Sequence, residues 1–168
     1  MAKKDAAKSS SKSKSSTVDG GIKIVARNRK ARHEYELLEK VEAGIVLTGT
    51  EVKSLRNGKA NLEDSYAEID REEVWLIGCD IPEYLQANRM NHVPKRKRKL
   101  LLHRREIDKL KSKSSEKGLT IVPLSIYFKK GIAKVELFVA RGRKTFDKRE
   151  ALKKQDAKRE MDRALRKR

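Results

Sequence analysis

One stretch of the sequence limits the possible folds more than any other, the segment 43–62, which reads AGIVLTGTEVKSLRNGKANL. Across residues 35–47, apolar side chains recur at every second position or a multiple of it, which is the period of one face of a β-strand. Thr48 and Glu51 have the spacing of a helix capping box, and Gly58 fits the end of that helix, because glycine adopts left-handed backbone without steric cost. The segment therefore predicts a long strand, one short helix and a return into a sheet.

The short helix is basic, and so is the whole chain. Lys53, Arg56 and Lys59 are expected to point from this helix toward solvent. Lys and Arg total 43 against 24 Asp and Glu in 168 residues, which gives a formal net charge of +19. A field of this strength attracts phosphate backbones or anionic membranes. We interpret the helix and the barrel that carries it as a platform for a polyanion, and RNA as the expected partner.

Two further features place the chain in the cytoplasm. No apolar run approaches the ~20 residues that span a bilayer, and no apolar region follows the N-terminal lysines as in a secretory signal. The single cysteine, Cys79, cannot form an internal disulfide and suits a reducing compartment. We expect Cys79 to be a small buried core residue, and we expect no membrane contact.

The alternation of apolar and polar residues predicts about six strands, two short helices and no βαβ repeat. This pattern indicates a mainly β chain folded as a closed antiparallel barrel, and a Greek-key arrangement of the OB-fold type suits this strand number. Pro123 predicts an edge position or a bulge, and Gly78 predicts a bulge or a bend. In the strand 119–128, the alternation places Leu124, Ile126 and Phe128 toward the interior. The predicted strands cover residues 22–26, 35–47, 65–70, 74–81, 119–128 and 132–140, with a hairpin at 129–131.

Two basic segments interrupt the strands. Residues 28–35 read as a turn that carries His33. Residues 95–105 contain seven Lys and Arg residues and no acid, and their triple leucine is predicted to lead into the second helix, with a contact to RNA. A merely solvated loop is the alternative interpretation of this cluster.

The composition divides the chain into three parts. Residues 1–21 are predicted to be a disordered basic arm, 22–145 the barrel, and 146–168 a basic tail. Asp147 and Glu150 can cap a helix in the tail, but its apolar stripe is too thin to hold that helix against the barrel. The tail is therefore expected to become helical only on binding an anionic groove.

The sequence carries no signature of catalysis. The three histidines, His33, His92 and His103, lack the spacing of metal ligands, and no glycine-rich nucleotide-binding loop is present. The adjacent acids at 63–64 and 72–73 fit solvated turns better than a nuclease site. We therefore expect no cofactor, no metal and no enzymatic activity. A basic RNA-processing nuclease and a structural ribosomal or general RNA-binding protein are the alternatives.

Four motifs together resemble one family, the SsrA-binding protein (small protein B) family of bacterial trans-translation. The resemblance runs from about residue 24 to the C-terminus, and its central motif is long and ungapped. The motifs are 28–35 (NRKARHEY), 42–62 (EAGIVLTGTEVKSLRNGKANL), 98–102 (RKLLL) followed by Arg105 and Glu106, and 140–144 (ARGRK) followed by 147–149 (DKR).

The resemblance implies a monomeric OB-fold adaptor that binds the tRNA-like domain of transfer-messenger RNA (SsrA) and delivers it to stalled ribosomes. The tail would enter the small-subunit decoding region and become helical in the empty mRNA channel. The residues implied in RNA binding are Asn28, His33, Glu42, Leu101 and Lys134. The residues implied in the decoding region are Gly142, Lys144, Phe146, Asp147, Lys148 and Arg149.

The side chains of these residues are chemically suited to the RNA contacts that the resemblance implies. Glu42 on a basic face can accept hydrogen bonds from base or 2′-OH donors, and Leu101 can contact an unstacked base, with barrel core as its alternative role. Lys134 is a phosphate contact or an exposed lysine. Phe146 stands where the family usually has histidine or tyrosine, so stacking is retained there and a hydrogen bond is lost.

Overall fold

The computed structural model describes residues 21–87, 91–143, 157 and 161. Within them, seven antiparallel strands and three helices of six or more residues are formed. No helix in these ranges is long and apolar enough to cross a membrane. The strands are β1 (Ile22–Arg27), β2 (Tyr35–Ile45), β3 (Tyr66–Asp70), β4 (Glu73–Ile77), β5 (Arg98–Leu101), β6 (Leu119–Lys129) and β7 (Ile132–Gly142).

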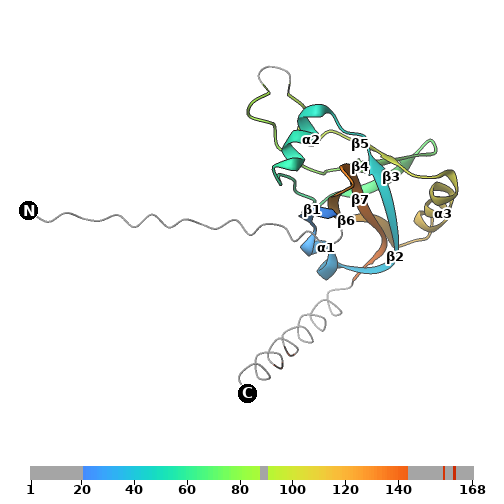
Figure 1. Cartoon of the computed structure of the whole chain (residues 1–168). Helices are drawn as coiled ribbons and strands as arrows, with labels where there is room; N and C mark the ends of the chain where they lie inside the picture. The colour runs from blue at the N-terminus through green and yellow to red at the C-terminus, as the bar shows by residue number, and fades with distance from the viewer. Residues whose placement is uncertain (1–20, 88–90, 144–156, 158–160, 162–168) are drawn as a thin grey trace, which may run out of the picture.

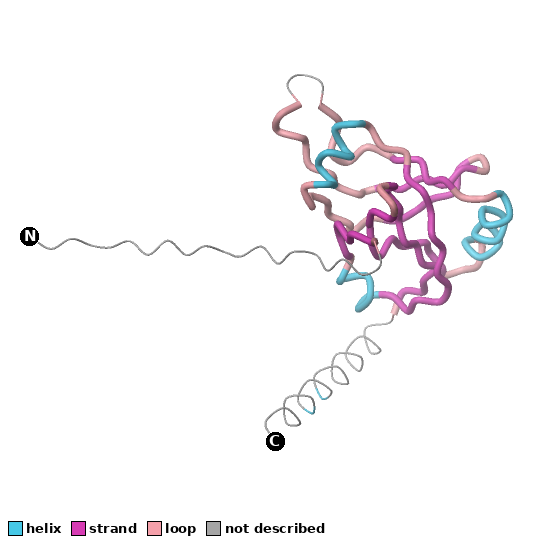
Figure 2. Tube along the Cα trace, viewed as in Figure 1, coloured by secondary structure: helices cyan, strands magenta, loops and turns pink. Residues whose placement is uncertain are grey.

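Six of these strands close into a ring. The sheet order is β1-β6-β3-β4-β5-β2-β7. An additional pairing of β6 with β7 closes the six strands from β6 to β7 into the ring. β1 stays outside the ring and pairs only with β6, as predicted for an edge strand. Figure 1 shows the strands gathered in one body with the helices at its periphery, and Figure 2 shows the same arrangement by element type. The predicted closed antiparallel barrel is confirmed.

The hairpin between β6 and β7 sets the register in which these two strands pair. Lys129 pairs with Ile132, and the two residues between them, Lys130 and Gly131, have φ angles of 50° and 80°. Positive φ at both central positions is the type I′ turn whose twist matches the strands. The hairpin predicted at this point is therefore confirmed, and it places Tyr127 directly opposite Lys134.

A bulge in β6 confirms one prediction and corrects another. The register between β6 and β7 shifts between Pro123 and Ser125, as the proline indicated. The extra residue turns Leu124 away from the barrel interior, where the alternation had placed it. Leu124 packs instead with Ala31 and Val122 in a second cluster outside the barrel.

The junction of β2 with the first predicted helix is confirmed. The helix α2 (Gly49–Arg56) begins after Thr48, whose backbone N–H donates to the Glu51 carboxylate at 2.7 Å. Gly58 follows the helix with φ of 75°, in the left-handed region that ends helices. The predicted start and stop of this helix therefore both lie where the sequence placed them.

One local prediction was wrong, and one strand was missed. Residues 29–34 form a helix, α1 (Arg29–Glu34), and not a turn, and the Asn28 side chain caps it by accepting from the Ala31 N–H. Residues 98–101 form the strand β5, which was not predicted, and the predicted second helix, α3 (Arg104–Ser114), follows it. The pairing of β5 with β2 and β4 overrides the local signal for helix.

The strand β4 is shorter than the predicted 74–81 because Gly78 bends the chain. Gly78 has φ of 76°, and a Cβ at this position would lie 3.1 Å from the backbone oxygen of Asp64. Only glycine combines this conformation with this approach. The bend predicted at Gly78 is confirmed, and it ends the strand.

The core lies inside the ring and is built from the inward face of each strand. Cys79 belongs to it and is fully buried, as predicted. The second, smaller cluster lies between α1 and the outer faces of β6 and β7 and holds α1 in place. The largest apolar side chains sealed in the interior are Leu55, Leu62, Leu76, Ile81, Leu100, Leu110, Ile121, Ile126 and Leu137.

Candidate nucleic-acid interface

Three of the predicted RNA-binding residues meet on the outside of the barrel. Gly44 of β2 pairs with Leu101 of β5 on one side and with Lys134 of β7 on the other. Glu42 lies two residues earlier on the same face of β2. These residues line an open pocket of about 450 Å³, and the start of α3 supplies its remaining wall. The complete lining is Glu42, Gly44, Leu101, Leu102, His103, Glu106 and Lys134.

Glu42 is the centre of a polar network in this pocket. Its carboxylate accepts from the Lys134 ammonium and from the Tyr127 hydroxyl, and Lys129 lies 3.9 Å away. The hydrogen bonds from Lys134 and then from Tyr127 hold the pKa of Glu42 below its usual range. Burial, followed by the hydrogen bond to Glu42, raises the pKa of Tyr127. Glu42 is therefore an ionised acceptor at neutral pH, and Tyr127 is a donor.

Leu101 presents an apolar surface to solvent. Its side chain is 53% exposed, whereas its neighbour Leu100 is 2% exposed and fills the core. This contrast follows from the strand period of β5, in which successive side chains point to opposite faces. The alternative role of Leu101 as barrel core is therefore wrong, and Leu100 has that role.

A second, larger pocket adjoins the first at Glu42. It has a volume of about 630 Å³ and lies between β1 and α1 on one side and β6, β7 and β2 on the other. Its second carboxylate, Glu136, would have a raised pKa from burial alone, but hydrogen bonds from Lys40 and Ser125 outweigh burial and lower the pKa. The cations on its wall are Arg27, Arg29, Arg32, Lys40 and Lys129.

Asn28 has its side chain engaged within the protein. Its exposed fraction is 4%, its Oδ1 accepts from the Ala31 N–H at 2.9 Å, and its Nδ2 donates to the Leu62 carbonyl at 2.8 Å. The residue caps α1 and ties it to the segment before β3. A direct contact of Asn28 with RNA stays a prediction, and the structure gives the residue a role in positioning α1.

His33 lies apart from the pocket of Glu42, Leu101 and Lys134. It is exposed in the last turn of α1 and lines neither pocket described above. The next residue, Glu34, accepts a backbone hydrogen bond from Arg143 at 2.9 Å, and Tyr35 pairs with Gly142. The structure thus brings His33 toward Gly142 at the root of the tail. The predicted tail residues Lys144, Phe146, Asp147, Lys148 and Arg149 lie outside the described residues.

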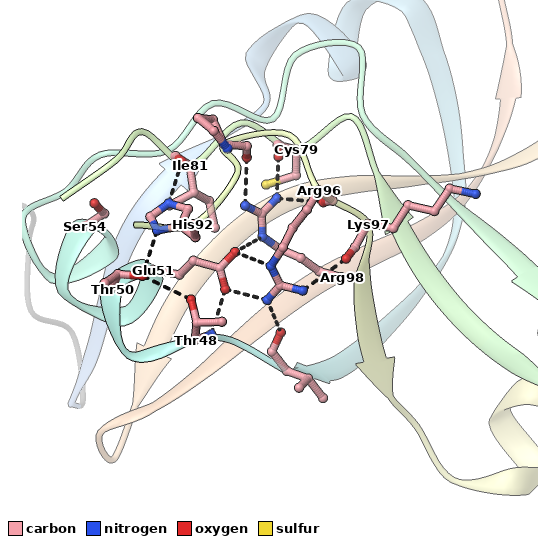
Figure 3. Close-up of polar contacts among 12 residues, drawn as sticks. Thr48, Thr50, Glu51, Ser54, Cys79, Ile81, His92, Arg96, Lys97 and Arg98 are labelled. Carbon is pink, nitrogen blue, oxygen red and sulfur yellow. Dashed lines mark hydrogen bonds and ion pairs between the residues drawn. The ribbon is translucent and has the colours of Figure 1, made fainter. Parts of the chain in front are cut away.

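The basic cluster at 95–105 is partly structural, because Arg96 and Arg98 are bound to an acid within the fold, and contact of its other basic residues with RNA stays a prediction. Arg98 is 0% exposed and donates from Nε to Glu51 at 2.8 Å, and Arg96 donates to the same carboxylate at 2.8 and 2.6 Å (Figure 3). The remaining Arg98 donors reach the carbonyl oxygens of Cys79 and Pro94 at 2.6 and 2.8 Å. Burial would raise the pKa of Glu51, but hydrogen bonds from Arg96 and the Thr48 N–H lower it to about 2.

In the same region, Cys79 and His92 are engaged within the fold. Burial raises the pKa of the Cys79 thiol to about 11, so the thiol stays protonated and unreactive. His92 is buried with one ring nitrogen 2.9 Å from the Ile81 carbonyl oxygen and the other 2.9 Å from the Thr50 hydroxyl (Figure 3). Within the described ranges, no three His, Cys, Asp or Glu residues are grouped to hold a metal ion.

Sequence reasoning did not single out five further residues in or beside the pocket: Gly44, Leu102, His103, Glu106 and Tyr127. Tyr127 could have been found by counting back from the two-residue hairpin, which pairs it with Lys134. Glu106 stands three residues after His103, the spacing of a helix cap, and its carboxylate accepts from the His103 N–H at 2.8 Å. Gly44 carried no local signal, because its importance arises from its neighbour across the sheet.

A small closed barrel with cations on its outer face and a pocket that combines an exposed leucine with hydrogen-bonding groups is typical of the nucleic-acid-binding β-barrels. The family model described as SmpB protein matches residues 25–167. The chain therefore belongs to the SmpB family.

Individual relatives agree with this assignment. An SsrA-binding protein of Streptomyces avermitilis is 58% identical over 147 residues, which are 88% of this chain and 83% of the relative. One of Carboxydothermus hydrogenoformans is 58% identical over 144 residues, or 86% and 97%. A similar solved structure, described as "tmRNA-SmpB: a journey to the center of the bacterial ribosome", has a TM-score of 0.63 and 50% identity, and the match covers 73% of this chain and 85% of that one.

Proposed function

We propose that this chain is an RNA-binding adaptor of trans-translation, which binds the tRNA-like domain of transfer-messenger RNA and delivers it to stalled ribosomes. Membership of the SmpB family and the names of its relatives support this role. The similar solved structure, of SmpB with transfer-messenger RNA and the ribosome, supports the two partners.

One observation on this chain carries the proposal: Glu42, Leu101 and Lys134, from three different strands, line a single pocket. The exposed leucine suits the face of an unstacked base, the ionised carboxylate suits N–H or 2′-OH donors, and the lysine suits a phosphate. The chain acts by binding and carries out no chemistry on the RNA. Its place of action is the cytoplasm, where ribosomes translate.

Each of the three segments of the chain has its own proposed role. The barrel, residues 22–145, holds the RNA. The tail, residues 146–168, enters the empty mRNA channel and becomes helical there, and His33 belongs with Asn28 to the RNA-binding surface of the barrel. Residues 1–21 are a basic arm.

The test is to identify the RNA that the full chain retains in cells. We expect tagged wild-type protein to recover transfer-messenger RNA, and the double variant Leu101→Ser, Lys134→Gln to recover much less of it. Lys117→Gln, at an exposed position outside the pocket, is the matched charge control. Recovery of general messenger or ribosomal RNA, unaffected by the double variant, would contradict the proposal.

The alternative of a structural ribosomal protein predicts a different distribution. A structural component sediments with ribosomes whether or not they are stalled, whereas an adaptor associates conditionally. The alternative of a nuclease predicts cleavage of labelled RNA by the purified chain when magnesium is added.

A further inference from the structure

The pocket beside Leu101 contains two carboxylates, in a protein with a large excess of cations. Glu42 enters from β2, and Glu106 enters from the first turn of α3. A phosphate at this position would be repelled by both groups. The arrangement therefore suits a neutral group that carries N–H donors, and the edge of a nucleobase is such a group.

Glu106 is held ready to accept a hydrogen bond. Its Oε2 accepts from the backbone N–H of His103 at 2.8 Å, which fixes the side chain against the start of α3. Its Oε1 accepts no hydrogen bond from any residue that the structure describes. Glu42 accepts one hydrogen bond at each oxygen, and each carboxylate oxygen has a second lone pair to offer.

Gly44 gives the pocket its apolar floor. A Cβ at Gly44 would lie 3.2 Å from the Cβ of Leu101 and 3.6 Å from its Cδ1. The φ angle of Gly44 is not among the positive ones, so a side chain here would act by crowding Leu101 and not by straining the backbone. Without a side chain at 44, Leu101 lies across β2 and keeps a flat exposed surface next to the two carboxylates.

We propose that this pocket takes one unstacked guanine, with Leu101 against its face and the carboxylates of Glu106 and Glu42 accepting from its N1–H and N2–H₂ groups. Gly44 is a positioning residue for Leu101, and Lys134 contacts the adjoining phosphate. This inference rests on the proposed function and adds the base that the site selects and two residues, Gly44 and Glu106, that select it.

Guanine is preferred because of the pattern on its Watson–Crick edge. It carries two neighbouring N–H donors, and these match the acceptors of a carboxylate. Adenine and cytosine place a ring acceptor beside their amino group, and uracil places its N–H between two carbonyl oxygens. A carboxylate repels those acceptors, so the pocket discriminates against the other three bases.

Glu106→Gln tests the proposal, because base recognition and overall charge predict opposite changes in RNA affinity for this variant. Glutamine retains the helix cap and removes one negative charge. If RNA binding depended only on overall charge, this variant would bind more tightly. Base reading predicts a dissociation constant about tenfold higher, because one good bidentate contact gives about 1–3 kcal/mol of discrimination. The matched control, Glu116→Gln, removes an exposed carboxylate outside the pocket and should bind at least as tightly as wild type.

Gly44→Ala tests whether the space at Gly44 is needed to position Leu101. Its control is Gly49→Ala, because an added Cβ at Gly49 meets nothing within 4 Å. We expect the Gly44 variant to bind the RNA several-fold more weakly with an unchanged salt dependence, and the Gly49 variant to bind like wild type. Thermal unfolding of both variants shows whether the barrel is intact. If Gly44→Ala does not fold, the Glu106→Gln comparison decides alone.

The readout is binding of the full chain to a transcript of the tRNA-like domain, followed by probing with kethoxal, which modifies N1 and N2 of guanine. We expect wild type to protect one unpaired guanine that becomes reactive again with Glu106→Gln. Equal or tighter binding by Glu106→Gln, or the absence of such a guanine, would overturn the inference. Failure of wild type to bind the transcript at all would instead overturn the proposed function.

Discussion

At the scale of single residues, the most unusual group is the buried carboxylate of Glu51. Glu51 and Arg98 are both sealed from solvent, and Arg96 completes the cluster. Breaking a buried ion pair costs about 3–5 kcal/mol, because the remaining charge is left without a partner. The cluster joins α2 to the first residues of β5, so it holds the strand that carries Leu101.

The first prediction concerns pH. The pKa of Glu51 is lowered from 4.5 to about 2 in the folded chain, so its ionised form stabilises the fold above about pH 4.5, and this contribution is lost as the pH falls toward 2. At 1.36 kcal/mol per unit, the contribution is about 3 kcal/mol. We expect the difference in free energy of unfolding between wild type and Glu51→Gln, measured with urea, to shrink by about that amount between pH 6 and pH 2.

The control for this prediction is Glu68→Gln, which changes an exposed carboxylate on β3. Its difference from wild type should vary far less over the same range. A difference between wild type and Glu51→Gln that is independent of pH would show that Glu51 is not held ionised by its arginine neighbours.

The second prediction separates a structural role of Asn28 from a role in RNA contact. Asn28→Ala removes the cap of α1 and its hydrogen bond to the Leu62 carbonyl, which still accepts from Ser65. We expect a loss of about 1–3 kcal/mol in the free energy of unfolding. Asn57→Ala, at an exposed position after α2, should change stability much less. Full stability with weakened RNA binding would instead favour a direct contact.

At the scale of elements, the sequence was most informative where local signals agree with the sheet. The run from β2 into α2, the hairpin before β7 and the bulge at Pro123 were all predicted, because periodicity, cap spacing and turn residues are short-range properties. β5 was not, because its leucines and basic residues fit a helix equally well until β2 and β4 are present beside it. The burial of Arg98 depends on Glu51, 47 residues away, and no local pattern indicates such a partner.

The third prediction compares two glycines that end elements. Gly58 and Gly78 both have φ near 75°, but an added Cβ meets nothing at Gly58 and the Asp64 carbonyl oxygen at 3.1 Å at Gly78. Left-handed backbone costs a residue with a side chain roughly 1–2 kcal/mol. We therefore expect Gly58→Ala to lose about that amount and Gly78→Ala to lose clearly more, by urea unfolding. Equal losses would show that the close approach at Gly78 has no energetic weight.

At the scale of the whole molecule, the cations fall into two groups. Some are bound to acids within the fold, such as Lys109 and Lys113, which both pair with Glu39. Others, such as Lys53 and Arg56 on α2, are exposed and form no ion pair with any described residue, and Lys53 lies 5.5 Å from the centre of the Tyr84 ring. Both groups contribute to the formal net charge of +19, but only the unpaired cations are free to contact phosphates. RNA binding should therefore depend on the unpaired cations more than on the paired ones.

The fourth prediction concerns the tail. The barrel closes through residues 22–142 alone, so removal of residues 147–168 should leave its core intact. We expect the truncated chain to bind the tRNA-like domain with nearly unchanged affinity and to fail to support tagging of proteins on stalled ribosomes. Tagging that persists at the wild-type level would show that the tail is not the sensor of the empty channel.

We expect the outer face of this barrel to bind a tRNA-like RNA through the pocket of Glu42, Leu101 and Lys134. The most direct measurement is the equilibrium binding of the purified full chain to a labelled transcript of the tRNA-like domain over a series of salt concentrations. We predict tight binding that weakens steeply with salt, and a slope of log affinity against log salt reduced by about one for Lys134→Gln. Binding no tighter than to an unstructured RNA of equal length, or unaffected by Leu101→Ser and Lys134→Gln, would contradict the account.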